Sequence, residues 1–131
     1  GSGQASLGVS TMSVASHTIT ATYSGNPTIN ASTSANLTQT VNKALTNVAA
    51  ANGTGFLRRT YSATLSRAHD GARLSGRPIV FSIAGTTICT ATTNANGVAS
   101  CTVTGVVIGG TYTASYAGDG NHLPSSGSAN A

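Results

Sequence analysis

Cys89 and Cys101 are the side chains best suited to chemistry, and they stand twelve positions apart in the segment CTATTNANGVASC. The run Asn94-Ala95-Asn96-Gly97 between them consists of turn formers, and Asn-Gly flanked by alternating residues predicts a β-hairpin. The two strands of this hairpin would place the cysteines on neighbouring rungs, near disulfide distance. A metal site needs more ligands, and a redox motif has a shorter spacing. The pattern favours a structural disulfide, which implies an oxidising compartment.

Acidic chemistry is nearly absent, because Asp70 and Asp119 are the only carboxylate side chains and the chain has no Glu. A glycosidase needs two carboxylates across the scissile bond, and these two fall in separate predicted turns. Two-metal phosphoryl transfer needs several charged oxygen ligands. The many serines and threonines lack the adjacent base that would make a nucleophile, and no G-x-S-x-G elbow occurs. We therefore expect no enzyme activity and no cofactor.

Three histidines, His17, His69 and His122, are the remaining candidates for metal ligands. A zinc site needs three or four ligands with supporting partners. His17 and His122 stand beside predicted turns, and the two cysteines are expected to bond to each other. Asp119 in AGDGN resembles part of a calcium loop, but one carboxylate binds calcium weakly. The interpretation is surface histidines, a turn-forming Asp119 and no metal site.

Five of the six cationic side chains stand between positions 58 and 77, namely Arg58, Arg59, Arg67, Arg73 and Arg77. With Lys43 they give a formal net charge of +4. Such a patch could bind anionic glycans, teichoic acid, lipid headgroups or nucleic acid. A chain with 6% charged residues also needs net charge to stay dispersed, and this interpretation is favoured. Nucleic acid is the least favoured ligand, because no aromatic platform interleaves with the arginines.

Short β-strands must position these residues, because apolar residues alternate with Thr and Ser along most of the chain. The expected strands cover residues 4–12, 17–24, 32–42, 61–67, 77–85, 86–93, 97–104, 110–117 and, as a weak edge strand, 122–131. Residues 43–54 are interpreted as a linker that runs into a strand. No helix is expected, and no stretch approaches the roughly 20 apolar residues of a membrane span. Turns at this spacing predict a β-sandwich or barrel.

The chain repeats itself, because residues 17–34 match residues 110–127 at an offset of 93 positions. A second match, at an offset of 94, aligns residues 3–6 with residues 97–100. Residues 1–43 therefore correspond to the back half of a unit, and residues 44–131 to a nearly complete unit. The strongest matches surround one turn, to which we assign a structural role: Tyr23, Gly25, Tyr116, Gly118 and Asp119.

Two long segments, SHTITATYSGNPTINASTSANLTQTV and the chain from LSGRPIVFSIAG to NHLPSS, resemble bacterial immunoglobulin-like domain repeats. The strand-turn-strand TYTASYAGDGNHLPS and the segment GTTICTATTNANGVASCTV carry the likeness. The resemblance implies an all-β, Ig-like Greek-key β-sandwich at residues 44–131 and a partial second repeat, its C-terminal half, at residues 1–43. The arginines of GTGFLRRTYSATLSRAHDGARLSG depart from the family pattern.

The resemblance implies a non-enzymatic, extracellular module of a bacterial surface or secreted protein, acting as a spacer or fibre subunit. A half sandwich leaves strand edges bare. We therefore expect self-association through sheet edges, as a homo-oligomer or filament, in which the C-terminal edge HLPSSGSANA accepts LTQTVN of a neighbour. The alternative is an adhesin or carbohydrate-binding module that recognises anionic cell-surface glycans through loops and the arginine patch. Neither nucleic acid nor membrane insertion is expected.

Overall fold

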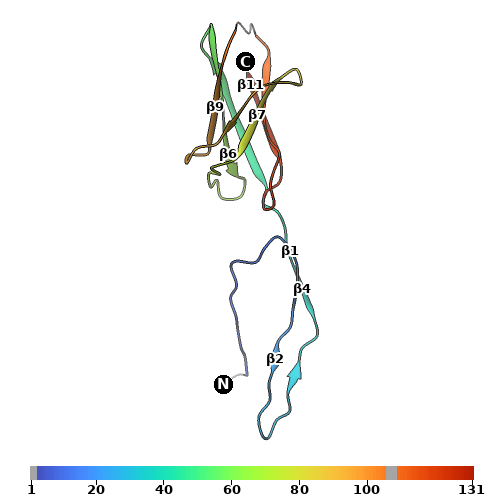
Figure 1. Ribbon diagram of the computed structural model, residues 1–131. Coiled ribbons are helices and arrows are strands. Elements are labelled where there is room, and N and C mark those ends of the chain that lie inside the picture. The colour runs from blue at the N-terminus through green and yellow to red at the C-terminus, as the bar shows by residue number, and fades with distance from the viewer. Residues whose placement is uncertain (1–2, 106–108) are drawn as a thin grey trace. The chain divides into compact units, whose positions relative to one another are not determined.

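The computed structural model describes residues 3–105 and 109–131; Gly1 and Ser2, assigned above to the partial repeat, lie outside them. The regular structure of the described residues consists of β-strands, without a helix. Contacts divide the chain into two units, residues 1–43 and residues 44–131 (Figure 1). The two units are described below one at a time.

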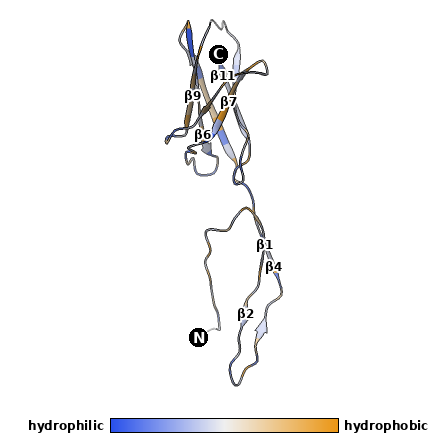
Figure 2. Cartoon of the chain, viewed as in Figure 1, coloured by the Kyte–Doolittle hydropathy of each residue, from blue (hydrophilic) through white to orange (hydrophobic). Residues whose placement is uncertain are grey.

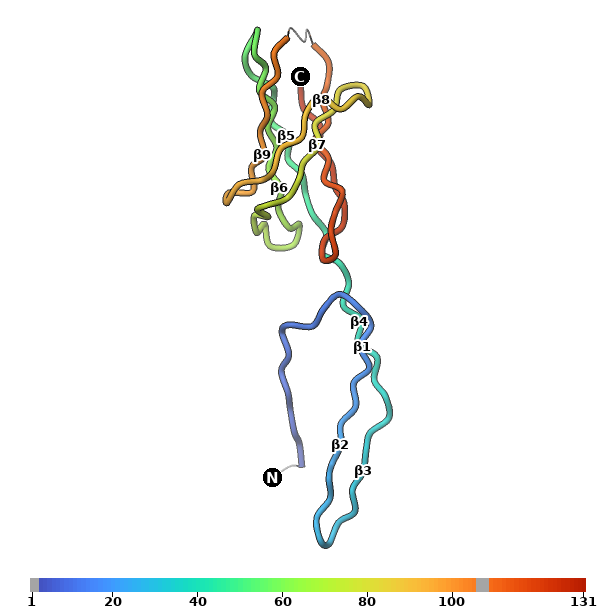
Figure 3. The backbone as a smooth tube through the Cα atoms, viewed as in Figure 1, coloured from blue at the N-terminus to red at the C-terminus, as the bar shows by residue number. Residues whose placement is uncertain are grey.

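The described part of the second unit, residues 44–105 and 109–131, holds seven strands in two sheets, which Figure 3 traces as a tube. One sheet has the order β5-β6-β9 and the other the order β11-β10-β7-β8, and all paired strands are antiparallel. The strands are β5 (Thr46–Thr54), β6 (Arg58–Arg67), β7 (Pro78–Ile83), β8 (Thr86–Thr92), β9 (Val98–Thr104), β10 (Thr111–Tyr116) and β11 (Ser125–Asn130).

One hydrophobic core lies between these two sheets, because every second residue of the central strands points inward. The fully or almost fully buried residues include Tyr61, Ala63 and Leu65 on β6, Ile79 and Phe81 on β7, and Tyr112, Ala114 and Tyr116 on β10. In Figure 2 the hydrophobic colour is strong along β7. The rings of Tyr61 and Tyr112 meet edge to face across the sheets, with centroids 4.9 Å apart. This all-β arrangement fits a β-sandwich.

The outer edge of β11 lies against β5 of the other sheet. Ala44 and His122 form a parallel bridge at one end of this seam, and the backbone N–H of Asn130 donates to Oδ1 of Asn52 (3.2 Å) near the other. Between them the hydroxyl of Thr46 donates to the carbonyl oxygen of Leu123 (2.8 Å). The edge that was expected to accept LTQTVN of a neighbour therefore lies against β5, the first strand of the same unit.

Strands β8 and β9 do not form the expected hairpin. The turn itself is present, since the N–H of Gly97 donates to the carbonyl of Asn94 (2.9 Å). Beyond it, β8 pairs with β7 and β9 pairs with β6, so the two strands belong to different sheets. The prediction of neighbouring rungs was wrong, because a turn signal reports only a local reversal, while β8 and β9 pair with β7 and β6 in different sheets.

The first unit contains a two-stranded hairpin, residues 15–41, built from β1 (Ala15–Ile19), β2 (Thr22–Tyr23), β3 (Ser32–Thr33) and β4 (Leu37–Val41). β1 pairs with β4 and β2 with β3, and one extra residue between β3 and β4 interrupts the ladder. Residues 4–12, expected as a strand, form none. Their counterpart in the second unit, β9, pairs with β6, and the described part of the first unit has no strand equivalent to β6.

Candidate functional site

The disulfide between Cys89 and Cys101 is present, and it joins the two sheets of the second unit. The Cα atoms lie 6.5 Å apart, and both residues are half-buried beside the core. Cys89 stands opposite Phe81 on β7, and Cys101 opposite Tyr61 on β6. The bond therefore ties the outer strands β8 and β9 together on one side of the core. On the other side β5 and β11 are joined by hydrogen bonds, so the two sheets are connected on both sides of this unit.

The turns predicted from the repeat have the same hydrogen bonds in both units. Oδ1 of Asp119 accepts the backbone N–H groups of Asn121 and His122, both at 2.8 Å. Oδ1 of Asn26 accepts those of Thr28 and Ile29, at 2.9 and 2.8 Å. These residues correspond one by one at the offset of 93. Asp and Asn both accept these bonds, which explains the exchange of one for the other between the copies.

The glycine before each turn is required by its backbone. Gly25 has φ 80° and Gly118 has φ 82°, a conformation that residues with a side chain rarely adopt. A Cβ on Gly118 would lie 2.8 Å from the carbonyl oxygen of His122, and one on Gly25 would lie 2.9 Å from that of Ile29. The two turns therefore share their shape as well as their sequence.

Asp119 is also the centre of a polar cluster that the partial copy lacks. Its Oδ2 accepts the hydroxyl of Tyr116 (2.8 Å) and lies 3.0 Å from Nη1 of Arg77, while Nδ1 of His122 lies 2.9 Å from Oδ1. Burial by itself would raise the pKa of Asp119, but hydrogen bonds from the backbone N–H of Asn121, the hydroxyl of Tyr116 and the ring of His122 hold it well below its usual range. Burial, with the hydrogen bond to Asp119 and its charge, raises the pKa of Tyr116 to about 12.

Core positions of the repeat differ sharply in exposure between the copies. Tyr112 and Ala114 are 0% exposed and Tyr116 is 2% exposed. Their counterparts at the offset of 93 are Ile19, which is 41% exposed, Ala21, which is exposed, and Tyr23, which is 43% exposed. The hairpin of the first unit therefore presents to solvent the face that the second unit buries.

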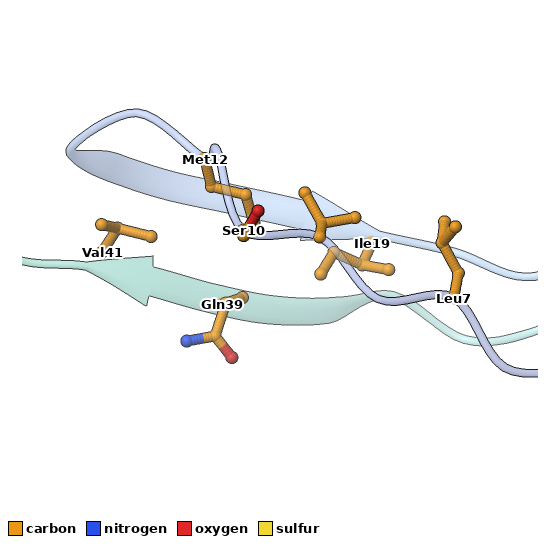
Figure 4. A pocket seen from close by; sticks show the side chains of 7 residues that line it. Leu7, Ser10, Met12, Ile19, Gln39 and Val41 are labelled. Carbon is orange, nitrogen blue, oxygen red and sulfur yellow. The ribbon is translucent and has the colours of Figure 1, made fainter.

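Residues 3–12 and this hairpin form two open grooves between them. The first has a volume of about 490 Å³ and its apolar lining is Leu7, Val9, Met12, Ile19 and Val41, most of which Figure 4 labels. The second has a volume of about 550 Å³, and its lining includes Ala5, Ala21 and Tyr23. The exposed apolar face is thus one wall of both grooves.

The five arginines do not form one patch. Arg58 and Arg59 stand where β6 begins, and Arg67 stands where β6 ends, about 30 Å away along ten residues. Nη2 of Arg67 contacts Oδ2 of Asp70 (2.6 Å). Arg73 lies near Arg67, because it forms a backbone bridge with Ser66. Arg77 contacts Asp119. Arg59 bonds through Nη1 to the carbonyl of Gly55 (2.7 Å). Three of the five are therefore committed to bonds within the unit.

The three histidines have different surroundings. His69 is largely exposed and His17 contacts the carbonyl of Ser13 through Nε2 (2.8 Å). His122 departs from the expected surface position, because only 12% of its side chain is exposed in the cluster around Asp119. Within residues 3–105 and 109–131 no three His, Cys, Asp or Glu side chains come together as a metal site would require.

Two buried polar groups were not identified from the sequence. Thr93 is 3% exposed; its hydroxyl donates to the carbonyl of Leu74 (2.7 Å) and accepts the N–H of Arg77 (2.9 Å). The Tyr112 hydroxyl contacts the carbonyl oxygens of Ser62 (2.7 Å) and Ala51. A threonine at a strand end and a tyrosine in an alternating strand carry no sequence signal for such long-range bonds.

No protein family, curated protein or solved structure that we compared matches this chain. Among the described residues there is also no helix with the length and apolar character to cross a membrane. The site therefore has to be interpreted from its own geometry.

Proposed function

We propose that residues 44–131 are an Ig-like Greek-key module and that the protein is a non-enzymatic structural spacer or fibre subunit of a bacterial surface or secreted protein. The order of the strands supports this fold, because β6 leads to β7, β8 to β9 and β9 to β10 by crossing between the sheets. Such crossings are typical of the immunoglobulin fold. The likeness of both sequence segments to bacterial Ig-like repeats supports the same assignment.

The parallel seam between β5 and β11 is the observation that carries the mechanical function. β5 begins at one end of the unit beside His122, and β11 ends at the other beside Asn52. A pull on residues 44 and 131 therefore loads the two strands in shear. In shear the bonds along the seam resist together, whereas in peeling they break one after another. A module that resists tension at its ends suits a spacer.

The disulfide supports both the mechanical role and an extracellular location. It prevents extension of the chain between Cys89 and Cys101, which are separated by twelve positions. Disulfides persist in oxidising compartments. The anionic-glycan alternative depended on loops and an arginine patch, and the arginines stand at both ends of β6 with three of them bonded within the unit. We therefore do not propose glycan binding.

Single-molecule force measurements on the full chain, held at its two ends, test this function. We expect residues 3–43 to extend at low force and residues 44–131 to unfold in a separate event at clearly higher force. With reductant, this second event should lengthen by about 35 Å, which is twelve residues at ~3.5 Å less the Cα separation of 6.5 Å.

The matched control changes only the direction of the load. A handle attached through Gly120→Cys, in place of the C-terminus, pulls at the same end of the unit as Ala44, because the turn that holds Gly120 lies beside Ala44. The strands are then peeled, and the unfolding force should fall. Equal forces in the two geometries, or a unit that yields together with the hairpin, would contradict the mechanical function.

A further inference from the structure

The turn between β5 and β6 exposes two large apolar side chains that follow each other in the sequence. Phe56 is 75% exposed and Leu57 is 64% exposed. They stand at the apex of a narrow hairpin, between the end of β5 and the start of β6, which is the green tip in Figure 3. Residues 55–59 are called the β5–β6 tip below. Neither side chain belongs to the core of the unit, so packing within the unit does not explain them.

Hydrogen bonds hold the β5–β6 tip on both sides. The N–H of Gly105, just after β9, donates to the carbonyl oxygen of Leu57 (3.1 Å). Nη1 of Arg59 donates to the carbonyl oxygen of Gly55 (2.7 Å). Gly55 has φ 92°, and a Cβ at this position would collide with the carbonyl oxygen of Arg58. The apolar side chains therefore project from a turn with a defined backbone.

The β5–β6 tip carries two positive side chains and no negative one. Arg58 is exposed, and Arg59 donates to backbone oxygens of Gly55 and Ala131 rather than to a carboxylate side chain. Asp70 and Asp119 are the only carboxylate side chains of the chain. Both stand at the opposite end of the unit, where β6 ends and β5 begins. That end is about 30 Å away along β6, several times the Debye length at physiological salt.

This combination fits an anionic lipid surface better than a protein or a soluble polyanion. Two side chains of this size offer on the order of 300 Å² of apolar surface, whereas a specific protein interface buries roughly 1,000 Å² or more. A soluble polyanion would attract the arginines but would leave Phe56 and Leu57 in water. A bilayer interface takes up small groups of aromatic and aliphatic side chains, and its headgroup phosphates attract the basic residues beside them.

We propose that the β5–β6 tip binds the surface of an anionic phospholipid membrane, with Phe56 and Leu57 inserted among the upper acyl chains and Arg58 at the headgroup phosphates. Arg59, half-buried behind them, adds its charge. Thr104, opposite Arg58 on β9, is exposed and polar, so the strands behind the tip remain in the headgroup layer. The proposal replaces, for this one turn, the expectation that the protein does not insert into membranes. It goes beyond the proposed function and does not depend on it.

Flotation of the full chain with lipid vesicles tests the proposal. We expect binding to vesicles made of equal parts phosphatidylcholine and phosphatidylglycerol, and binding about tenfold weaker or less to phosphatidylcholine alone. On the anionic vesicles the double variant Phe56→Ala with Leu57→Ala should bind about tenfold more weakly, and Arg58→Gln about fivefold more weakly.

The matched controls are exposed residues at the opposite end of the unit. Leu45 is 66% exposed just before β5 begins, and Arg73 is exposed near the end of β6. Leu45→Ala and Arg73→Gln remove the same kinds of side chain as the test variants. Both should bind the anionic vesicles as the original chain does, because neither residue reaches a membrane that the β5–β6 tip contacts.

A tryptophan in the tip reports insertion directly, because the chain has no Trp of its own. The emission of Phe56→Trp should shift to the blue with anionic vesicles, and lipids brominated in their acyl chains should quench it. Leu45→Trp should show neither effect. Polyphosphate is the soluble comparison, and it should leave the emission of Phe56→Trp unchanged.

Equal binding by the double variant and the original chain, or an unshifted emission of Phe56→Trp, would overturn the proposal. So would a stronger response to polyphosphate than to anionic vesicles, because the tip would then be a site for soluble polyanions. An original chain that sediments as a dimer, with a double variant that does not, would also overturn it, because a second copy would then cover Phe56 and Leu57. None of these outcomes alters the force at which residues 44–131 unfold, so the mechanical function is tested separately.

Discussion

Gly127 on β11 lies directly against the carbonyl oxygen of Val48 on β5. A Cβ built on Gly127 would stand 2.1 Å from that oxygen, closer than any side chain tolerates. The contact lies in the middle of the seam between the two sheets, between the bonds of Thr46 and those of Asn130. It closes the edge that a C-terminal strand would otherwise offer to a neighbour.

Gly127→Ala should therefore weaken the seam. The added methyl group forces β5 and β11 apart, and overpacking of this kind costs about 2 kcal/mol. Urea denaturation measures the loss in the free energy of unfolding. Gly120→Ala is the matched control, because a Cβ at Gly120 meets nothing within 4 Å. Equal stabilities of the two variants would show that the seam is not tightly packed in solution.

Loss of the disulfide should destabilise the second unit. The double variant Cys89→Ala with Cys101→Ala removes a cross-link over twelve positions, which stabilises a protein by about 3 kcal/mol. Thermal denaturation should show a lower Tm for this variant, and a reductant should lower the Tm of the original protein but not that of the variant. If neither the double variant nor the reductant lowers the Tm, the disulfide does not contribute to holding the two sheets together.

Acid should destabilise the protein through Asp119. The pKa of this carboxyl is lower in the folded chain than its ordinary value of 3.8. Its stabilising effect is therefore complete above pH 3.8 and is lost as the pH falls from there through the lower folded pKa. In Asp119→Asn, which retains the acceptor that Asn26 uses in the first unit, the free energy of unfolding should change less with acid.

The control for this titration is Asp70→Asn, which changes a carboxyl that is more exposed than Asp119. Denaturant titrations at several pH values between 2 and 6 give the free energy of unfolding as a function of pH for the original protein and for the two variants. If Asp70→Asn flattens the acid curve more than Asp119→Asn does, the cluster around Asp119 is not the main source of acid sensitivity.

Relief of backbone strain in the turn between β7 and β8 should stabilise the protein. Ala84 has φ 48° and is followed by Gly85 with φ 81°, and a two-residue turn with both φ values positive favours Asn-Gly. Ala84→Asn should therefore add about 0.5–1 kcal/mol to the free energy of unfolding. Ala95→Asn, in an exposed turn without positive φ at that residue, should add nothing. A stabilisation by both substitutions would indicate a general effect of asparagine.

Much of the local structure followed from the sequence. Alternation along residues 77–85 and 110–117 predicted strands, and β7 and β10 lie within these ranges. The repeat predicted one turn in two places, and Asn26 and Asp119 form it with the same bonds. These features depend on neighbours in sequence, such as a glycine with positive φ or an acceptor two residues before its donor.

Other expectations failed because they concerned partners far along the chain. Residues 4–12 alternate as a strand does, yet form none, since a strand needs a second strand to bond its backbone. The Asn94–Gly97 turn predicted a hairpin, but did not determine which sheet each following strand would join. The covered edge of β11 depends on β5, some 80 positions earlier in the chain.

By itself the sequence determined the all-β class, the two copies of one turn, and the pairing of two cysteines that have no other partner. Tertiary structure alone decided that the disulfide joins two sheets, that the arginines stand at both ends of β6, and that Tyr112 is buried while Ile19 is exposed. The physical reason is that alternation assigns each residue to a face of its strand, whereas long-range backbone pairing and packing determine what that face meets.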